Sequence, residues 1–239
     1  MKQKPSIDER LVELQQAKVL EILGQAAATG LQNTLELAMS AFYFADHVIK
    51  MVEAANTLPQ PLACEEGCHF CCCNQVELTP PEAIFLGHYA ESHFAEAEKQ
   101  ELSAALQRSL ELQAGKSKKD LARARPPCPL LKDRKCSAYA ARPLVCRAMH
   151  SLDAKKCESA YKNRDLTSPP YYAHRHDICF SISQGLLAGC RAGGCQAAPL
   201  ELAQALLDFL HQPRPVERWL QGEAVFTTYS RPKAIKKQR

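Results

Sequence analysis

The sequence has few aromatic residues and no long apolar stretch. Aromatic residues make up 7% of the 239 residues, with a single tryptophan at Trp219, so we expect a core built mainly from Leu, Ala, Val and Ile. No apolar run approaches the roughly 18 residues of a membrane-spanning helix. The first ten residues also lack the apolar stretch of a signal peptide. These absences predict a cytoplasmic protein with no membrane partner.

Runs of like charge are scarce and occur mainly in two segments of the chain, both of them basic. The net charge is +4, but the segment 231–239 alone carries five bases and no acid. A second basic stretch, 116–125, contains one acid, Asp120. Runs of this kind are usually solvated tails or linkers. Because no nucleic-acid-binding motif accompanies them, we do not expect a nucleic-acid partner.

Cysteine, in contrast, is abundant and clustered. The chain has 12 cysteines, which would suggest disulfides in a secreted protein but metal binding or redox chemistry in a reducing compartment. Packing places no demand on thiol spacing, whereas a C-x2–4-C turn brings two sulfurs onto one ion. The first block contains five thiols within ten residues: Cys64, Cys68, Cys71, Cys72 and Cys73.

A second block of thiols follows about sixty residues later. It begins with Cys128-Pro-Leu-Leu and continues through Cys136 to Arg142-Pro-Leu-Val-Cys146-Arg147. In this pattern the two blocks resemble the YkgJ-type cysteine-cluster family, the zinc- or iron-chelating CxxCxxCC domain. The resemblance covers roughly residues 60–150, and the third consecutive thiol, Cys73, lies outside the family's pattern.

The resemblance implies a metal-binding protein whose reaction is unassigned. Its cofactor would be zinc or an iron–sulfur cluster, of the 4Fe–4S type if the metal is iron. Flagellin lysine methylases are similar in the cysteine pattern, so an iron–sulfur-dependent, protein-modifying enzyme is one alternative. A protein that handles soft metal ions is another. The matched blocks supply seven candidate ligands: Cys64, Cys68, Cys71, Cys72, Cys128, Cys136 and Cys146.

Seven thiols are too many for one closed site, because a zinc ion and a cubane cluster each take about four. In an extended chain, Cys71 and Cys72 would point to opposite sides and would not bind one ion together. Gly67 would let the chain wrap tightly around the sulfurs. Arg142 and Arg147 flank Cys146, where they either lower its pKa or anchor the loop. We expect Tyr139 beside them to serve packing.

The remaining thiols suggest a second site. Cys190 and Cys195 lie in a glycine-rich turn. His174 and His176, two residues apart, would share one side of an extended strand. The candidates for this possible second site are Cys190, Cys195, Cys179, Cys157, His174 and His176.

The pattern predicts a mainly α fold, with a helical hairpin and an irregular, metal-stapled cysteine-cluster domain with flanking helices. Residues 1–57 should form the N-terminal hairpin, whose apolar face packs on the metal domain or mediates self-association or partner binding. Residues 58–150 should form the metal-binding domain. Residues 151–222 should complete the same globule with loops and helices, and 223–239 should be a basic tail.

Local signals predict several helix boundaries. Capping boxes at Ser6–Glu9 and Thr79–Glu82 should start helices, and Gly30 should end the first helix in a left-handed conformation. A tight loop is expected over 132–135, and the stretch 148–170 should be rich in loops. Pro199 should open a last long helix, 200–211.

The spacing Cys64-x3-Cys68-x2-Cys71 also occurs in radical S-adenosylmethionine enzymes. Those enzymes place it after the first strand of an α/β barrel. Here helices are expected before it, and no strand–helix repeat follows. A short motif without its structural context is weak, so we do not adopt this reading.

Overall fold

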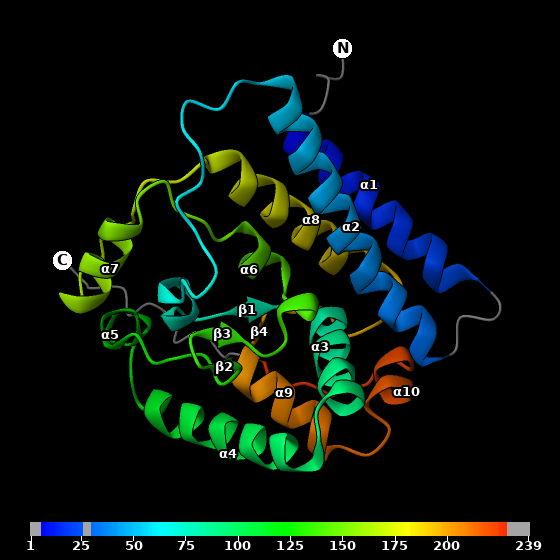
Figure 1. Cartoon of the computed structure of the whole chain (residues 1–239). Helices are drawn as coiled ribbons and strands as arrows, with labels where there is room; N and C mark the ends of the chain where they lie inside the picture. The colour runs from blue at the N-terminus through cyan, green and yellow to red at the C-terminus, as the bar shows by residue number, and fades with distance from the viewer. Residues whose placement is uncertain (1–5, 26–29, 229–239) are drawn as a thin grey trace, which may run out of the picture.

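The chain is mainly helical in the computed structural model, which describes residues 6–25 and 30–228 (Figure 1). The basic segment 231–239 lies outside the described residues. In the described part of the chain, no helix has both the length and the apolar character needed to cross a bilayer. The helices are α1 (Ile7–Gly24), α2 (Leu31–Ala55), α3 (Pro80–His93), α4 (Glu96–Gln113), α5 (Lys118–Ala124), α6 (Leu144–Ala148), α7 (Ala154–Lys162), α8 (Ala173–Ala192), α9 (Leu202–His211) and α10 (Pro215–Leu220), with 3-10 turns η1 (Phe70–Cys73) and η2 (Tyr139–Ala141).

Three long helices, α1, α2 and α8, run side by side along one edge of the molecule (Figure 1). The sequence predicted that α1 and α2 pair as a hairpin, but α1 packs most extensively along α8. Glycines on α8 permit this approach: a Cβ at Gly185 would lie 2.5 Å from the Val12 carbonyl oxygen, and one at Gly189 would lie 2.4 Å from the Val19 Cβ. The N-terminal helices are therefore joined to the C-terminal part of the chain by a close helix–helix contact.

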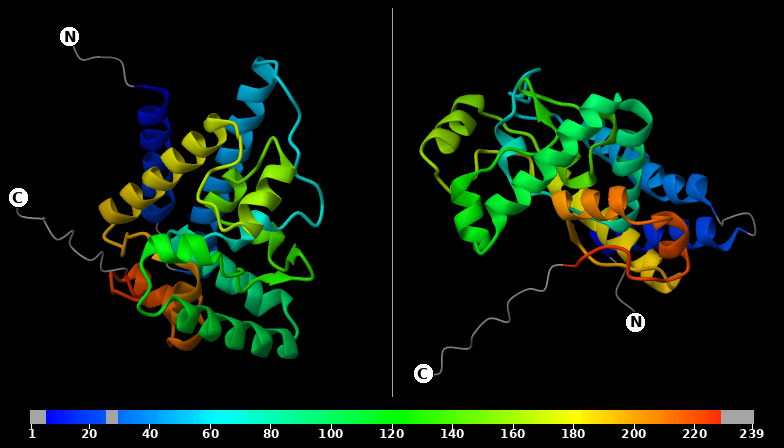
Figure 2. Two further views of the ribbon diagram at one scale, coloured as in Figure 1. Left: turned by 90° about the vertical axis from the view of Figure 1, so that its left-hand side faces the viewer. Right: turned by 90° about the horizontal axis from the view of Figure 1, so that it is seen from below.

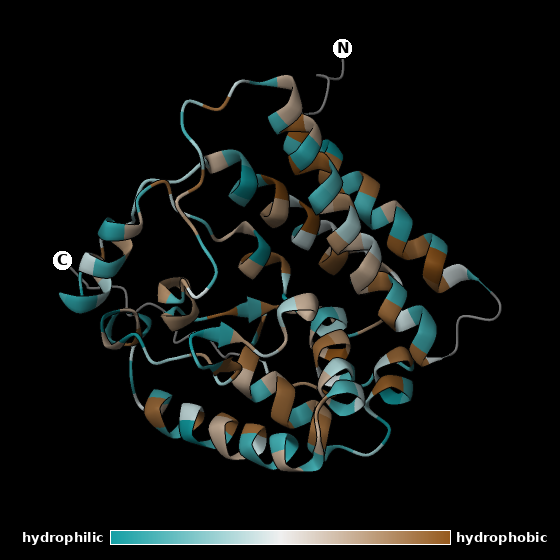
Figure 3. Cartoon of the chain, viewed as in Figure 1, coloured by the Kyte–Doolittle hydropathy of each residue, from teal (hydrophilic) through white to brown (hydrophobic). Residues whose placement is uncertain are grey.

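A second layer contains α3, α4 and α9 and lies on the other side of the short strands (Figure 2). Helix α9 packs against both α3 and α4, with Leu86, Leu106 and Leu206 fully buried. Apolar and polar residues alternate around α4, as expected for a helix with one face in water (Figure 3). The capping box predicted at Thr79 and Glu82 is confirmed at the start of α3.

Two short antiparallel strand pairs lie between these layers. Strand β1 (Glu77–Leu78) pairs with β4 (Leu200–Glu201), and β2 (Leu131–Lys132) pairs with β3 (Lys135–Cys136). The sequence predicted that the last long helix opens at Pro199 and Leu200. This boundary was wrong, because Leu200 and Glu201 pair with β1 and the Glu201 side chain caps α9.

One other local prediction was wrong, and two were incomplete. Gly30 was expected to end the first helix in a left-handed conformation, but it is the N-cap of α2 with φ −147°. The connector 116–125 contains helix α5, and the supposedly loop-rich stretch 148–170 contains helix α7. Both helices are short and begin at a polar cap, Ser117 and Asp153, whose side chains accept amide hydrogen bonds.

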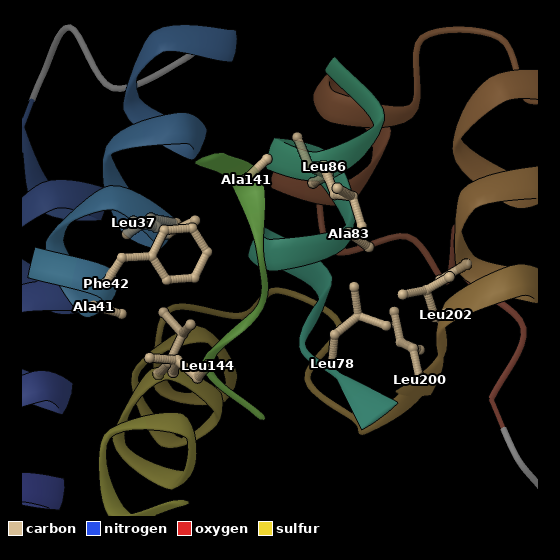
Figure 4. Packing of buried hydrophobic residues seen from close by; sticks show 14 of the residues in the cluster. Leu37, Ala41, Phe42, Leu78, Ala83, Leu86, Ala141, Leu144, Leu200 and Leu202 are labelled. Carbon is tan, nitrogen blue, oxygen red and sulfur yellow. The ribbon is translucent and has the colours of Figure 1, made fainter. Parts of the chain in front are cut away.

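The hydrophobic core is continuous across these segments. Figure 4 shows Phe42 of α2 near Leu144 of α6, and Leu78 of β1 beside Leu200 and Leu202. These residues belong to one buried cluster that also includes Trp219 of α10. This core holds α3, β1 and α6 in place, and those elements carry or adjoin the cysteine blocks.

Candidate metal centre

All seven predicted thiol ligands line a single cavity of about 620 Å³. The cavity, called the thiol chamber below, is bounded by the loop before η1, the β2–β3 hairpin and α6. Acidic and basic side chains also reach it, including Glu66, Arg134 and Arg142. The structure therefore brings together two cysteine blocks that are about sixty residues apart in the chain. The chamber thiols are those of Cys64, Cys68, Cys71, Cys72, Cys128, Cys136 and Cys146.

A tight turn presents the first block. Gly67 has φ +85°, a conformation that suits glycine, and the Cys68 amide donates to the Glu65 carbonyl. The chain then enters the 3-10 turn η1, so the prediction that Cys71 and Cys72 lie in extended chain was wrong. A hydrogen bond between their thiols is the main reason that the pKa of Cys71 is raised. Both thiols line the chamber rather than pointing to opposite sides of a strand.

A two-residue hairpin and a short helix present the second block. Asp133 and Arg134, both with positive φ, form the loop between β2 and β3, which places Cys136 on the chamber wall. Helix α6 carries Cys146, and its first amide, at Leu144, donates to the buried Glu82 carboxylate at 2.7 Å. The two blocks also meet directly, because the Cys128 amide donates to the Cys72 carbonyl at 2.7 Å.

The two arginines flanking Cys146 are held differently. Arg147 pairs with Asp46 of α2 at 2.9 Å and donates to the carbonyls of Arg142 and Ala140, so it anchors the loop. The guanidinium of Arg142 lies over the Tyr139 ring, 3.4 Å from its centroid. It is close enough to oppose the rise in pKa of both Cys71 and Cys136. Arg142 thus brings positive charge to the chamber while Tyr139 supports its position.

Burial keeps the second-block thiols protonated. It raises the pKa of Cys128 to about 12. Burial, reinforced by Cys128, Cys136 and Cys71, also raises the pKa of Cys146. Because thiolates are the metal ligands, a metal that binds here must displace protons from these groups.

The donor chemistry of the chamber fits a thiophilic metal such as zinc or iron. The cysteines of the described chain are free rather than joined as disulfides. Among the described residues, however, no three Cys, His, Asp or Glu side chains are grouped tightly enough to hold one ion. Binding would require thiols to turn toward one another inside the chamber, and a cysteine side chain does so about one torsion, χ1.

The residues suggested for a second site lie in separate places. Cys190 and Cys195 are buried near the C-terminal end of α8, and Cys179 is buried three turns earlier. His174 and His176 lie on helix α8, not on a strand, so their side chains point roughly 200° apart. His174 lies 3.0 Å from the Glu53 carboxylate.

Cys157 lies elsewhere, on α7, near the first cysteine block. Burial raises its pKa, and the nearby Cys68 and Cys71 raise it further. The structure thus does not gather the six candidates at one site.

Two residues at the chamber were not found from the sequence. The Ser151 amide donates to the Cys64 sulfur at 3.3 Å, and Asn74 accepts a hydrogen bond from Arg125. Neither residue carries a sequence signal, because both contacts depend on loops brought together by the fold.

Comparison with known proteins gives one match. Residues 63–179 match the model of the family CxxCxxCC, described as "Putative zinc- or iron-chelating domain". This segment contains both cysteine blocks and Cys157, and it ends before Cys190 and Cys195. Neither the curated proteins nor the solved structures include a significant match to the chain.

Proposed function

We propose that this protein, whose residues 63–179 match the model of the CxxCxxCC family, binds zinc or an iron–sulfur cluster in the thiol chamber. One observation carries the proposal: seven thiols from two distant blocks line one cavity, and the Cys128–Cys72 backbone hydrogen bond joins the blocks. Chance packing of small apolar side chains would not gather seven of twelve cysteines around a cavity.

Each metal would supply different chemistry when bound. Zinc has no redox chemistry and would tie the loops together, whereas a 4Fe–4S cluster would transfer electrons. In either case the Arg142 guanidinium would offset part of the negative charge of the thiolates. The free thiols support a cytoplasmic location as part of this proposal, because that compartment is reducing.

Anaerobic purification followed by metal analysis and a visible spectrum tests this proposal. A colourless protein with bound zinc would identify a structural or binding role. A brown protein whose absorbance fades in air would identify an iron–sulfur centre. Protein that retains neither metal after anaerobic purification and metal reconstitution would refute metal binding.

A second candidate function is the handling of soft metal ions. Cys64 and Cys71 are exposed at the chamber, which would let an incoming chelator or protein thiol reach a bound ion. In that case zinc or copper(I) would transfer to a competing chelator within minutes. A structural zinc site would instead lose its ion only as the protein unfolds.

A further inference from the structure

The outer face of helix α2 carries a regular stripe of side chains. Helix α2 lies at the edge of the molecule, with α1 and α8 beside it (Figure 1). Its broad apolar face is buried against these helices and α3, and the opposite face is turned to solvent. Each residue turns a helix by about 100°, so five residues of the solvent face lie within about 40° of one line: Glu36, Met39, Tyr43, His47 and Lys50.

These five residues, called the α2 stripe below, have apolar and aromatic side chains at their centre. Met39 is 51% exposed and Tyr43 is 76% exposed. The Tyr43 ring stacks on the His47 ring, with the centroids 6.2 Å apart and the planes inclined by 9°. Neighbouring large side chains left in water on one helix face are typical of a surface that packs on another helix.

The α2 stripe reads the same in both directions. Its residues are separated by 3, 4, 4 and 3 positions, and Tyr43 is the middle one. When a second copy packs its own α2 antiparallel to the first, with a twofold axis at Tyr43, each tyrosine faces the other. Met39 then faces His47 of the second copy. At the two ends of the stripe, Glu36 faces Lys50 of the second copy.

We propose that this protein forms a twofold-symmetric dimer through the α2 stripe, with the two α2 helices antiparallel. Charge complementarity selects a second copy as the occupant and sets its direction. The antiparallel arrangement pairs an acid with a base twice, whereas a parallel one would place Glu36 on Glu36 and Lys50 on Lys50. Such self-complementarity is what a twofold interface between identical chains requires.

The size of the stripe sets the strength of this association. Fourteen positions separate Glu36 from Lys50, which is about 21 Å of helix. One face of a helix of that length is smaller than the roughly 800 Å² that each subunit buries in a standard interface. The dimer is therefore weak and reversible, and it forms as the protein concentration rises.

The competing explanation is that the α2 stripe is an ordinary solvated helix face, because single exposed apolar side chains are common on monomeric proteins. The explanations differ in how association responds to charge. A solvated face leaves the protein monomeric at every concentration. A dimer formed through another surface would not respond to the charges at Glu36 and Lys50.

Sedimentation velocity of the full-length protein, kept reduced so that no disulfide links two chains, tests the proposal up to millimolar concentrations. We expect the wild type to shift from monomer to dimer, and Y43A to remain monomeric. K50E should weaken dimerisation about tenfold, because symmetry turns two attractive pairs into repulsive ones. The matched control is F180A, which removes an aromatic ring that is 66% exposed on α8. It should dimerise like the wild type.

A second charge reversal identifies the antiparallel pairing. E36K should weaken dimerisation as K50E does, and the double variant E36K/K50E should restore it, because opposite charges face each other again. Glu36 also attracts Lys18 of its own chain, so circular dichroism must show that each variant is folded. Should E36K fail to fold, Y43A and K50E still decide whether the stripe is the interface.

Three results would overturn the inference. They are a wild type that stays monomeric at every concentration, a dimer that Y43A and K50E leave unchanged, and a folded double variant that dimerises no better than K50E. None of these results bears on the proposed function, which the metal analysis of the purified protein tests separately. Loss of metal binding would equally leave the dimer in place, because the α2 stripe contains no residue of the thiol chamber.

Discussion

Replacing Glu82 by glutamine tests how the fold positions the second cysteine block. The Glu82 side chain is buried, and its carboxylate accepts three hydrogen bonds. One oxygen accepts from the Thr79 amide at 2.7 Å and from the Thr79 hydroxyl at 2.8 Å. The other oxygen accepts from the Leu144 amide at 2.7 Å, at the start of the helix that carries Cys146.

Glutamine keeps the size of the side chain but replaces one acceptor oxygen with an NH₂ donor. That donor must face either the Thr79 amide or the Leu144 amide, so one buried N–H loses its partner. Leaving a buried donor unsatisfied costs about 1–3 kcal/mol. For a chain of this length, each kcal/mol lowers Tm by roughly 2–4 °C.

The assay is thermal unfolding of E82Q, followed by circular dichroism, together with the metal content of the purified protein. The matched control is E98Q, because Glu98 accepts the Ala95 amide at 2.9 Å in an equivalent but exposed cap. We expect E98Q to change Tm little, since water can satisfy its freed amide. Equal Tm values for E82Q and E98Q would refute the argument that Glu82 fixes α6.

Three further predictions follow from other contacts. Removal of metal by a chelator should increase amide hydrogen exchange in 63–74 and 128–148 more than in α3, α4 or α9, whose packing is apolar. An equal increase in all of these segments would contradict this prediction. His150 donates to the Ala148 carbonyl and accepts from the Tyr172 amide, which requires a neutral ring, and burial lowers its pKa. The stability that neutral His150 contributes is present above its unfolded-state pKa of about 6.5 and is lost as pH falls. Tm should therefore drop more on acidification in the wild type than in H150Q. Parallel plots of Tm against pH for the two proteins would mean that His150 does not cause the acid sensitivity. G185A should lower the free energy of unfolding by about 1–3 kcal/mol, because the added methyl group overpacks against the Val12 carbonyl. The control G24A, with open space at its Cβ, should not destabilise the protein. If urea unfolding gave G185A the stability of the wild type, α1 and α8 would be able to separate freely.

Much of the fold was predictable from local signals. The capping boxes at Ser6 and Thr79 mark helix starts that do not depend on the rest of the chain. The tight loop expected over 132–135 is confirmed as the connection between β2 and β3. What the sequence could not show was the pairing of α1 with α8, since contact between distant helices leaves no local pattern.

The candidate site, like the fold, was predictable only in part. The spacing of the cysteines in the sequence pointed to the seven thiols that line the chamber, because metal binding constrains the spacing of its ligands. Their conformation was mispredicted at Cys71 and Cys72, where a run of three cysteines has no strong turn preference and tertiary contacts impose a 3-10 turn. The proximity of Cys157 to the first block depends on helix α7, which the sequence reading treated as loop, so that thiol was grouped with the wrong partners.

Metal-dependent alkylation would show whether both cysteine blocks bind metal in the thiol chamber. The anaerobically reconstituted protein and its chelated form would be treated with iodoacetamide under native conditions, and the labelled cysteines mapped by mass spectrometry. We predict that metal protects Cys64 and Cys71 of the first block and Cys136 of the second, and that chelation exposes all three to labelling. Protection confined to one block, or labelling unchanged by metal, would contradict the claim that both blocks bind metal in one chamber.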